Sequence, residues 1–315
     1  MLIRLGAIMN GSAALYKGSG SSGGAQSIIP IGMAQPDATY VRTMVSIDSI
    51  DRDYYVYPSP TQYNFKLPTA FKNVVAIRLL SMEIPMSFYV FTAEKGNTTL
   101  LIKEVGSSPF VKATIPDGNY TIPDLCFAVQ NAIIEATGNT TYNVSYDTST
   151  LKVNISNTSA QFRIDTQTNS LAQGLFWGLG YFLGFDKGIY GCDNNKSLTG
   201  VRIMNINPYN YMILDLGDLN MIQEGVTTKG YFTKVPLNVN NFNYVYLTPE
   251  CCSYNVAKFD PPIGRLDTIS VLWRFHDGVR IDFNGYNHSF MIEIITGEGR
   301  LNHPAINRWS GAGSH

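Results

Sequence analysis

Residues 41–91 constrain the fold most, because they contain runs of β-branched and aromatic residues separated by turn-forming residues. The runs begin at Val41, at residues 63–68, where polar and apolar residues alternate, and at residues 74–83. Proline, asparagine, aspartate and serine bound them, a pattern typical of the strands of an antiparallel sheet. The segment contains no nucleophile motif, phosphate-binding loop or metal-binding cluster, so we expect it to be structural.

Similar strands are predicted in the last third of the chain. They cover residues 201–206, 211–216, 231–237, 244–247, 254–259, 266–275 and 289–295. Together with residues 41–91 they give about eight or nine strands, the number expected for an antiparallel jelly-roll sandwich, in which eight strands form paired Greek keys. We therefore predict a mainly β fold.

The middle of the chain has a different pattern. Strands are predicted at residues 97–105, 142–146, 151–156 and 162–165, and residues 111–120 supply a further strand and a turn at Asp117-Gly118. This block is predicted to be a small α+β module inserted into the jelly roll.

One helix is predicted within this module. Thr121 is its expected N-cap, Pro123 lies in its first turn, and Asp124 follows the cap by three residues, a variant of the capping box. The helix should end at Gly138. A one-sided apolar stripe is expected to face the core, and it consists of Ile122, Leu125, Cys126, Val129, Ile133 and Ala136.

These patterns divide the chain into four parts. We predict an extended N-terminal arm over 1–40, a jelly roll over 41–96 and 191–297, the inserted module over 97–190 and a C-terminal tail over 298–315. The arm includes a Gly/Ser tether at residues 18–24, which cannot bury enough apolar surface to order itself. We expect such an arm to reach onto a neighbouring subunit.

The composition is unusual for a free cytosolic enzyme. Only 15% of the 315 residues are charged, whereas 19 are tyrosine and the net charge is -1. Subunit contacts favour tyrosine and disfavour lysine and glutamate, so the surface is expected to be covered by neighbours. The sequence contains no cluster of basic residues of the kind that nucleic-acid-binding faces show, so no nucleic-acid partner is expected.

Four cysteines are too few to staple a chain of this length, and no Cys/His spacing predicts zinc. Cys126, Cys192, Cys251 and Cys252 are expected to be buried thiols in a reducing compartment. No run of about 18 apolar residues predicts a membrane span, and Arg4 and Asn10 interrupt the apolar start before a signal-peptide core could form.

Two groups of polar residues could form sites. Asp48, Asp51 and Asp53 lack the glycine and terminal glutamate of a calcium loop, and Arg52 lies among them, which favours turn and salt-bridge chemistry. Glu83 has no second carboxylate nearby in sequence and is expected at a rim or facing a partner.

A cupin-type metal site would need histidine and carboxylate ligands at short spacing on neighbouring strands. The candidates are His276, His288 and His303, with Asp277, Asp282 and Glu293 near them, but these histidines are at least twelve residues apart. Hydrogen bonding in turns is the favoured role. Gly178, Gly180 and Gly184 are not followed by a phosphate-binding helix start. We therefore predict no catalytic, cofactor-binding or metal-binding residue.

The sequence resembles minor capsid and penton proteins of giant icosahedral (nucleocytoplasmic large) DNA viruses, diffusely over residues 41–295. The first matching elements are Ile47-Asp48-Ser49, Asp51-Arg52, Tyr57-Pro58-Ser59-Pro60, Tyr63, Leu67-Pro68, Asn73-Val74, Ile77, Leu79 and Glu83-Ile84-Pro85. The later ones are residues 116–121, Leu183-Gly184-Phe185, Leu266-Asp267 and residues 282–285. The motifs are turn and strand signals, and no catalytic residue carries over.

The resemblance implies a non-enzymatic virion protein that is assembled in the host cytoplasm. Its expected partners are the major capsid protein, other minor capsid proteins and copies of itself in a homopentamer. An indirect contact with an internal membrane is compatible with this role. It would either close the five-fold vertex or cement the capsid lattice. Two alternatives stay open: a carbohydrate- or receptor-binding jelly roll that uses exposed residues such as Trp177, and a cupin-like metalloenzyme.

Overall fold

The computed structural model describes residues 39–106, 109–168, 178–192, 196–223, 230–239, 243–248 and 256–298. The predicted arm and tail, apart from a residue or two at their inner ends, lie outside these ranges, as do Trp177, Cys251, Cys252 and His303. Thr39–Gly299 form one compact unit.

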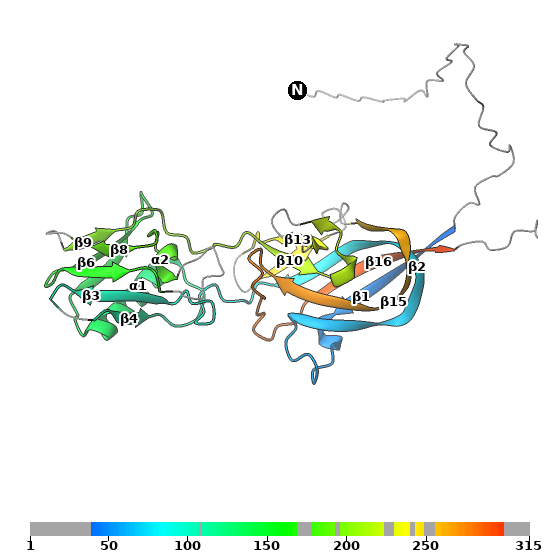
Figure 1. The fold of residues 1–315 in the computed structure, drawn as a ribbon, viewed down its shortest axis with the longest axis horizontal. Helices are drawn as coiled ribbons and strands as arrows, with labels where there is room; N and C mark the ends of the chain where they lie inside the picture. The colour runs from blue at the N-terminus through cyan, green and yellow to red at the C-terminus, as the bar shows by residue number, and fades with distance from the viewer. Residues whose placement is uncertain are drawn as a thin grey trace, which may run out of the picture. The chain divides into compact units, whose positions relative to one another are not determined.

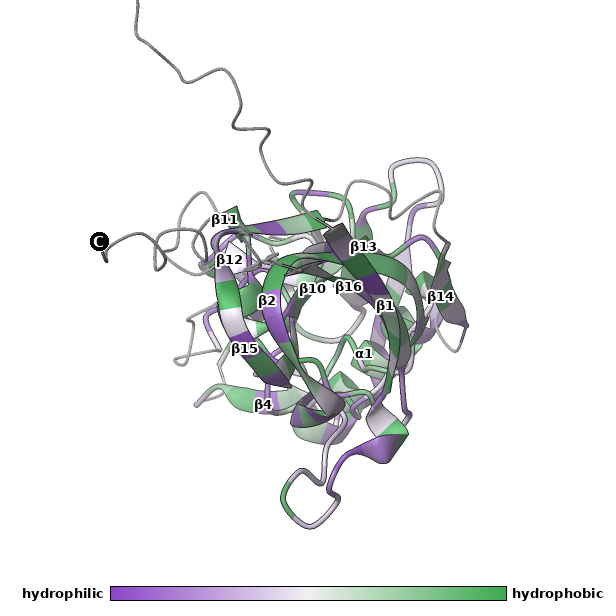
Figure 2. Ribbon diagram, turned by 90° about the vertical axis from the view of Figure 1, so that its right-hand side faces the viewer, coloured by the Kyte–Doolittle hydropathy of each residue, from purple (hydrophilic) through white to green (hydrophobic). Residues whose placement is uncertain are grey.

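The larger sheet is antiparallel throughout and joins the two ends of the described chain (Figure 1). Its strands lie in the order β1 (Thr39–Asp48), β16 (Ser289–Glu298), β2 (Gln62–Pro85), β15 (Val256–Arg274), β10 (Tyr211–Asp215) and β13 (Thr233–Pro236), and β14 (Tyr244–Leu247) also pairs with β2. Viewed along its length, the sheet curls around a central axis (Figure 2).

The long strand β2 serves both layers of a jelly roll. Its second half pairs with β16 on one side, from Val74 to Glu83, and with β14 and residues 256–258 of β15 on the other. Its first half pairs with residues 268–272 of β15. One layer is therefore β1, β16, the second half of β2, β14 and the start of β15, which we call the β1 layer. The other is the first half of β2, the rest of β15, β10 and β13. The two layers form a curled antiparallel sandwich, so the predicted jelly-roll fold class is confirmed.

Two pairs of strands that the sequence predicts as separate are each one continuous strand. Residues 63–68 and 74–83 belong to the single strand β2, and residues 266–274 continue the strand that begins at Val256. The register between β2 and β15 shifts at residues 67–70 and again at residues 259–262, which contain Pro68 and Pro261-Pro262. Since proline has no N–H to donate, it is tolerated where the ladder is interrupted, and the strands bend there instead of ending.

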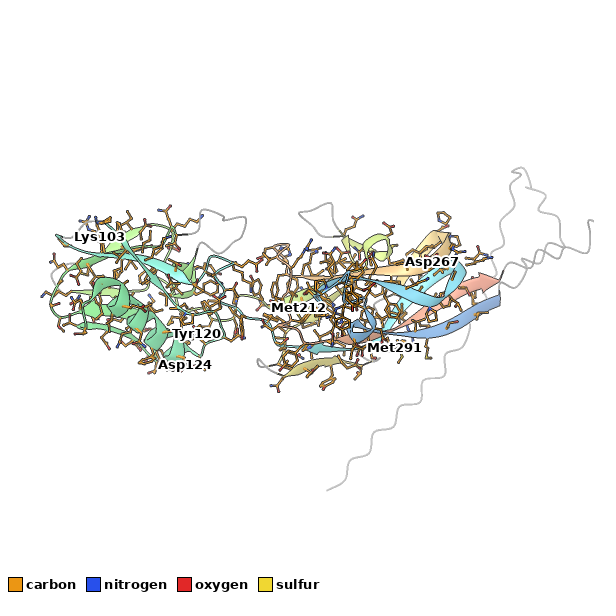
Figure 3. All side chains as sticks on the ribbon, turned by 90° about the horizontal axis from the view of Figure 1, so that it is seen from below. Lys103, Tyr120, Asp124, Met212, Asp267 and Met291 are labelled. Atoms are coloured by element: carbon orange, nitrogen blue, oxygen red, sulfur yellow. The ribbon has the colours of Figure 1, made fainter. Side chains whose placement is uncertain are left out.

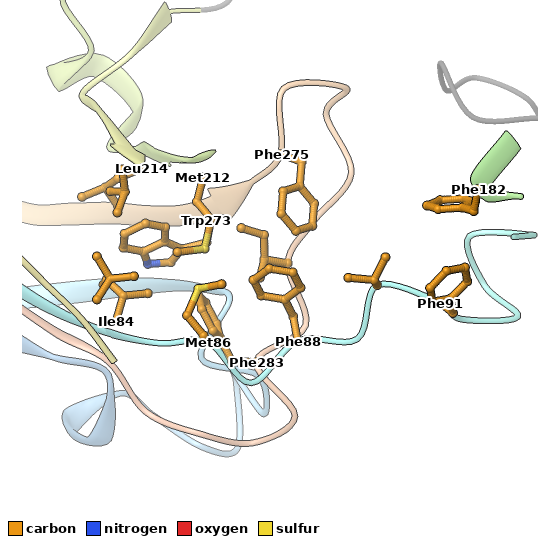
Figure 4. Packing of buried hydrophobic residues seen from close by; sticks show 14 of the residues in the cluster. Ile84, Met86, Phe88, Phe91, Phe182, Met212, Leu214, Trp273, Phe275 and Phe283 are labelled. Atoms are coloured by element: carbon orange, nitrogen blue, oxygen red, sulfur yellow. The ribbon is translucent and has the colours of Figure 1, made fainter. Parts of the chain in front are cut away.

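Aromatic side chains fill the space between the layers. Trp273, Phe275, Phe283 and Phe290 are fully buried, and Met86 and Met212 pack beside the indole (Figure 4). Trp273 and Phe283 meet edge to face, with ring centroids 6.0 Å apart. Alternation along β15 and β16 places Trp273 and Phe290 on the inner face, and Phe283 comes from the connection between these strands.

The inserted region forms two smaller sheets and a helix. One sheet has the order β4 (Val111–Thr114), β3 (Thr99–Glu104), β7 (Phe162–Asp165) and β8 (Ile189–Gly191); the other has the order β5 (Tyr142–Tyr146), β6 (Val153–Asn157) and β9 (Ser197–Thr199). The strand predicted at residues 201–206 is absent, although this segment is described. Its backbone instead donates from Arg202 to Gly184 and from Met204 to Leu151. The domain boundaries themselves stay a prediction.

Helix α1 (Ile122–Thr137) has the predicted limits. The Thr121 hydroxyl accepts a hydrogen bond from the Asp124 amide at 3.3 Å and donates to the Asp124 carboxylate at 2.6 Å. Gly138 adopts φ 71° and donates to Ile134. Figure 3 shows Tyr120 and Asp124 near the N-terminal end of the helix. The apolar stripe, including Leu125, Val129 and Ile133, is buried against the core as predicted.

Candidate interaction surfaces

A short loop follows β1, and its position is fixed by the buried side chain of Arg52. The guanidinium donates four hydrogen bonds: to the carbonyls of Ser49 (2.6 Å), Tyr57 (2.9 Å) and Pro58 (3.1 Å), and to the Asn287 amide oxygen (2.7 Å). Because these acceptors come from both sides of the loop and from the distant segment before β16, they hold the loop against the jelly roll.

The aspartates of this loop cap its backbone. Asp48 accepts from the Ile50 amide at 2.9 Å, and Asp53 accepts from the Tyr55 amide at 3.0 Å and the Val56 amide at 3.3 Å. The predicted turn chemistry is confirmed. The predicted salt bridge to Arg52 is wrong, since among the described residues the guanidinium contacts carbonyl and amide oxygens but forms no ion pair.

The outward side of this loop is apolar. Ile50, Tyr54, Tyr55 and Val56 are exposed large side chains, and Tyr55 is fully exposed. The Arg52 guanidinium lies 4.0 Å above the Tyr54 ring. Residues 50–56, which we call the Tyr55 loop, therefore present a held group of aromatic and aliphatic side chains, together with the exposed carboxylates of Asp51 and Asp53.

The outer face of the β1 layer carries a second group of exposed side chains. Residues directly opposite on neighbouring strands share a face, and the register gives two adjacent rows. One row contains Met44, Glu293, Arg78 and Val256; the next contains Arg42, Ile295, Ala76 and Lys258. Tyr40 lies one step further along β1, beside Gly297. Met44 is 68% exposed, and Tyr40 and Lys258 are also exposed.

Glu293 lies at the centre of these rows and is buried although it points outward. It is 4% exposed, and its carboxylate lies 3.8 Å from the Arg42 guanidinium and 3.6 Å from that of Arg78. One of its oxygens, Oε2, has no hydrogen-bond partner. We call Tyr40, Arg42, Met44, Arg78, Lys258, Glu293 and Ile295 the basic face.

His288 lies in the jelly-roll interior. Its Nε2 is 3.0 Å from the Pro60 carbonyl, and its ring is close to those of Tyr63, Trp273 and Phe283. Burial lowers its pKa from 6.5 to about 4, so the imidazole is neutral at pH 7. His288 does form a hydrogen bond, but in the buried interior and not in a turn as predicted.

The other metal candidates are dispersed. His276 is exposed near Tyr211, and the carboxylates of Asp277 and Asp282 accept from backbone amides two residues on, at 3.1 and 2.9 Å. Within the described ranges, no group of three or more His, Cys, Asp or Glu side chains is placed to hold a metal ion.

Glu83, the remaining carboxylate, lies on β2 and is partly buried. It accepts a hydrogen bond from the Ser289 hydroxyl at 2.6 Å. Its register partner on β14 is Tyr246, which is exposed, so Glu83 lies on the same outer face as the basic face but nearer the other end of β1.

The glycines of residues 178–184 serve close packing. A Cβ at Gly180 would lie 2.6 Å from the Thr166 side chain, and one at Gly184 would collide with the Arg202 carbonyl. The two described cysteines, Cys126 and Cys192, are free and buried as predicted, and burial raises the pKa of the Cys126 thiol to about 11.

The turn residues of the Tyr55 loop can be recognised in the sequence, but its apolar outer side and the basic face cannot. Arg42, Arg78 and Lys258 are far apart in the chain, so only the strand register brings them together. Alternation along β1 could have placed Tyr40, Arg42 and Met44 on one face, but it does not supply their neighbours.

Residues 34–245 match the family described as "Family of unknown function (DUF5901)". The chain belongs to this family. No curated protein matches the chain. Among solved structures, the crystal structure of a selenomethionine-labelled mavirus penton protein is similar, with a TM-score of 0.45 and 9% sequence identity, over 82% of this chain and 100% of that one. No helix in the described parts of this family member has the length and apolar character needed to cross a membrane.

Proposed function

We propose that the protein is a structural subunit of a virus capsid and that it binds neighbouring capsid proteins. The observation that carries the proposal is a jelly roll with two outward-facing groups of large side chains, the Tyr55 loop and the basic face. A free monomer gains nothing from holding exposed tyrosine and methionine in place, whereas a subunit contact is enriched in tyrosine, methionine and arginine.

The sequence resemblance to minor capsid and penton proteins supports the same role. We infer a homopentamer at the five-fold vertex in preference to a cement protein under the facets, since a single jelly roll with one inserted module suits a vertex subunit. Residues 1–40 and 298–315 would bind the surrounding capsomers, including the major capsid protein. The protein would act without catalysis, in particles assembled in the host cytoplasm.

Electron cryo-microscopy of intact particles, reconstructed without imposed symmetry at the vertex, tests this proposal. We expect five copies around each five-fold axis. Copies distributed beneath the facets would make the protein a lattice cement, and absence from the particle would contradict a capsid role.

A glycan array tests the main alternative. Exposed tyrosines such as Tyr55 and Tyr246 offer stacking surfaces, although Trp177, which the sequence favoured for this role, lies outside the described residues. Specific and saturable glycan binding would contradict a purely structural function.

A further inference from the structure

We propose that the Tyr55 loop of one copy binds the basic face of a second copy. The inference rests on the proposed self-association of the subunit and names the two surfaces that carry it. It joins the exposed aromatic and acidic side chains of residues 50–56 to the exposed cations and apolar side chains around Glu293.

The loop has the features of a preorganised contact. Its backbone is fixed by the Arg52 and Asp53 hydrogen bonds, so little conformational entropy remains to be lost on binding. Its outward side chains combine four apolar or aromatic groups with the carboxylates of Asp51 and Asp53. Arg52 offsets one of these two carboxylates, so residues 50–56 keep a net charge of -1 (two carboxylates and one guanidinium).

The basic face complements the loop in charge and in polarity. Three cations, Arg42, Arg78 and Lys258, surround one buried carboxylate, so the patch has an excess of positive charge. Arg42 is 65% exposed and its contact with Glu293 is long, so its remaining N–H groups can bind a carboxylate. Tyr40, Met44 and Ile295 supply the apolar area between the cations.

The two surfaces cannot meet within one copy. The loop begins at Asp48, whereas Arg42 lies six residues earlier on the same strand, a distance of about 20 Å at 3.3 Å per residue. Arg52 and Asn287 hold the loop at the Asp48 end of the strand. A contact between the loop and the basic face must therefore join different copies.

A single contact of this kind uses a different surface on each partner. Repeated head to tail, such contacts form a closed ring when the rotation between copies closes. A ring is the assembly that a vertex subunit requires. A two-fold dimer with two reciprocal loop–face contacts is the other closed arrangement, and the mass from sedimentation equilibrium distinguishes the two.

Charge reversal tests the pairing in the full-length protein. We would measure self-association by sedimentation equilibrium for the wild type, Asp51→Arg, Arg42→Glu and the double variant. Both residues are exposed, and circular dichroism and thermal unfolding would verify that each variant folds. Lys66→Glu and Glu135→Arg serve as matched controls, because they reverse exposed charges outside both surfaces.

We expect each single reversal to weaken association about a hundredfold, since like charges placed together in an interface cost several kcal/mol. The double variant should recover most of the affinity, because each of its junctions again pairs opposite charges. An equimolar mixture of the two single variants should recover part of it, since unlike neighbours pair opposite charges but a ring of five must keep at least one like-charged junction. The controls should behave as the wild type does.

Three results would overturn the inference: a wild type that stays monomeric at its highest soluble concentration, single variants that associate normally, or a double variant that stays as weak as the singles. A protein that self-associates and occupies the particle but ignores the reversals would refute this contact and leave the capsid function intact. A protein absent from the particle would refute the proposed function instead.

Discussion

At the scale of single residues, the Arg52 side chain holds the loop between β1 and β2 in one conformation. Its guanidinium donates four hydrogen bonds, to the carbonyls of Ser49, Tyr57 and Pro58 and to the Asn287 amide oxygen. Because hydrogen bonds from a charged donor contribute more than neutral ones, the loss of all four has a large effect on the loop.

Replacing Arg52 with methionine should therefore destabilise the protein by about 2–4 kcal/mol. Chemical denaturation would measure this loss, and limited digestion with chymotrypsin should show faster cleavage after Tyr54 or Tyr55. Lys72→Met, at an exposed site on β2, is the control and should change neither measurement. Unchanged protease resistance in the Arg52 variant would show that the loop is held by other contacts.

His288 makes stability depend on pH in the acidic range. Its pKa in the folded protein is about 4, below its ordinary value of 6.5, so between these values the unfolded chain binds a proton that the folded protein does not. Stability from this group is therefore complete above pH 6.5 and falls as the pH drops towards 4. The loss should be on the order of 3 kcal/mol.

Replacement with glutamine tests this, because glutamine does not titrate and can still donate to the Pro60 carbonyl. Urea unfolding of His288→Gln and of the wild type should be compared at pH values from 4 to 7.5. We expect the difference between them to shrink or reverse at low pH, since only the wild type must release a proton to fold. Parallel curves would mean that His288 does not carry the pH dependence.

At the scale of elements, two glycines with positive φ have different reasons for being glycine. Gly138 ends α1 at φ 71° with open space around its α-carbon, whereas Gly184 follows α2 (Leu179–Phe182) at φ 84° against the Arg202 carbonyl. The first position needs only the left-handed conformation. The second also needs the absence of a side chain.

Alanine at the two positions separates these effects. Gly138→Ala should cost about 1 kcal/mol, which is the strain of the backbone conformation alone. Gly184→Ala should cost a further 1–3 kcal/mol, roughly, because the added carbon meets backbone that must shift. If both variants lost the same free energy of unfolding, measured by heat or urea, residues 200–204 would have moved away from the added carbon at position 184 without cost.

At the scale of the whole molecule, the region inserted between β2 and β10 leaves and re-enters the jelly roll at one place. Phe88 and Tyr209 both pack on Phe275, with ring centroids 5.1 and 3.7 Å from it. The two ends of the insertion are therefore close together in space, a geometry that permits removal without stretching the chain.

Replacing residues 90–207 with a short Gly/Ser linker should leave a folded jelly roll. Near-ultraviolet circular dichroism should retain the signal of the buried Trp273, and unfolding should stay cooperative. A molten or aggregated product would indicate that the jelly roll needs the inserted module to fold, contrary to the predicted domain boundaries.

The sequence by itself determined the fold class, the helix over residues 122–137 and the turn chemistry of Asp48 and Asp53. These features depend on local patterns: period-2 alternation, capping residues and short side chains that bind nearby amides. The tertiary structure alone decided that β2 and β15 run through their prolines, that residues 201–206 are not a strand, and that Arg42, Arg78 and Lys258 share one face with Glu293. Each of those outcomes depends on which strands pair and in which register, and this is set by contacts between residues distant in the chain.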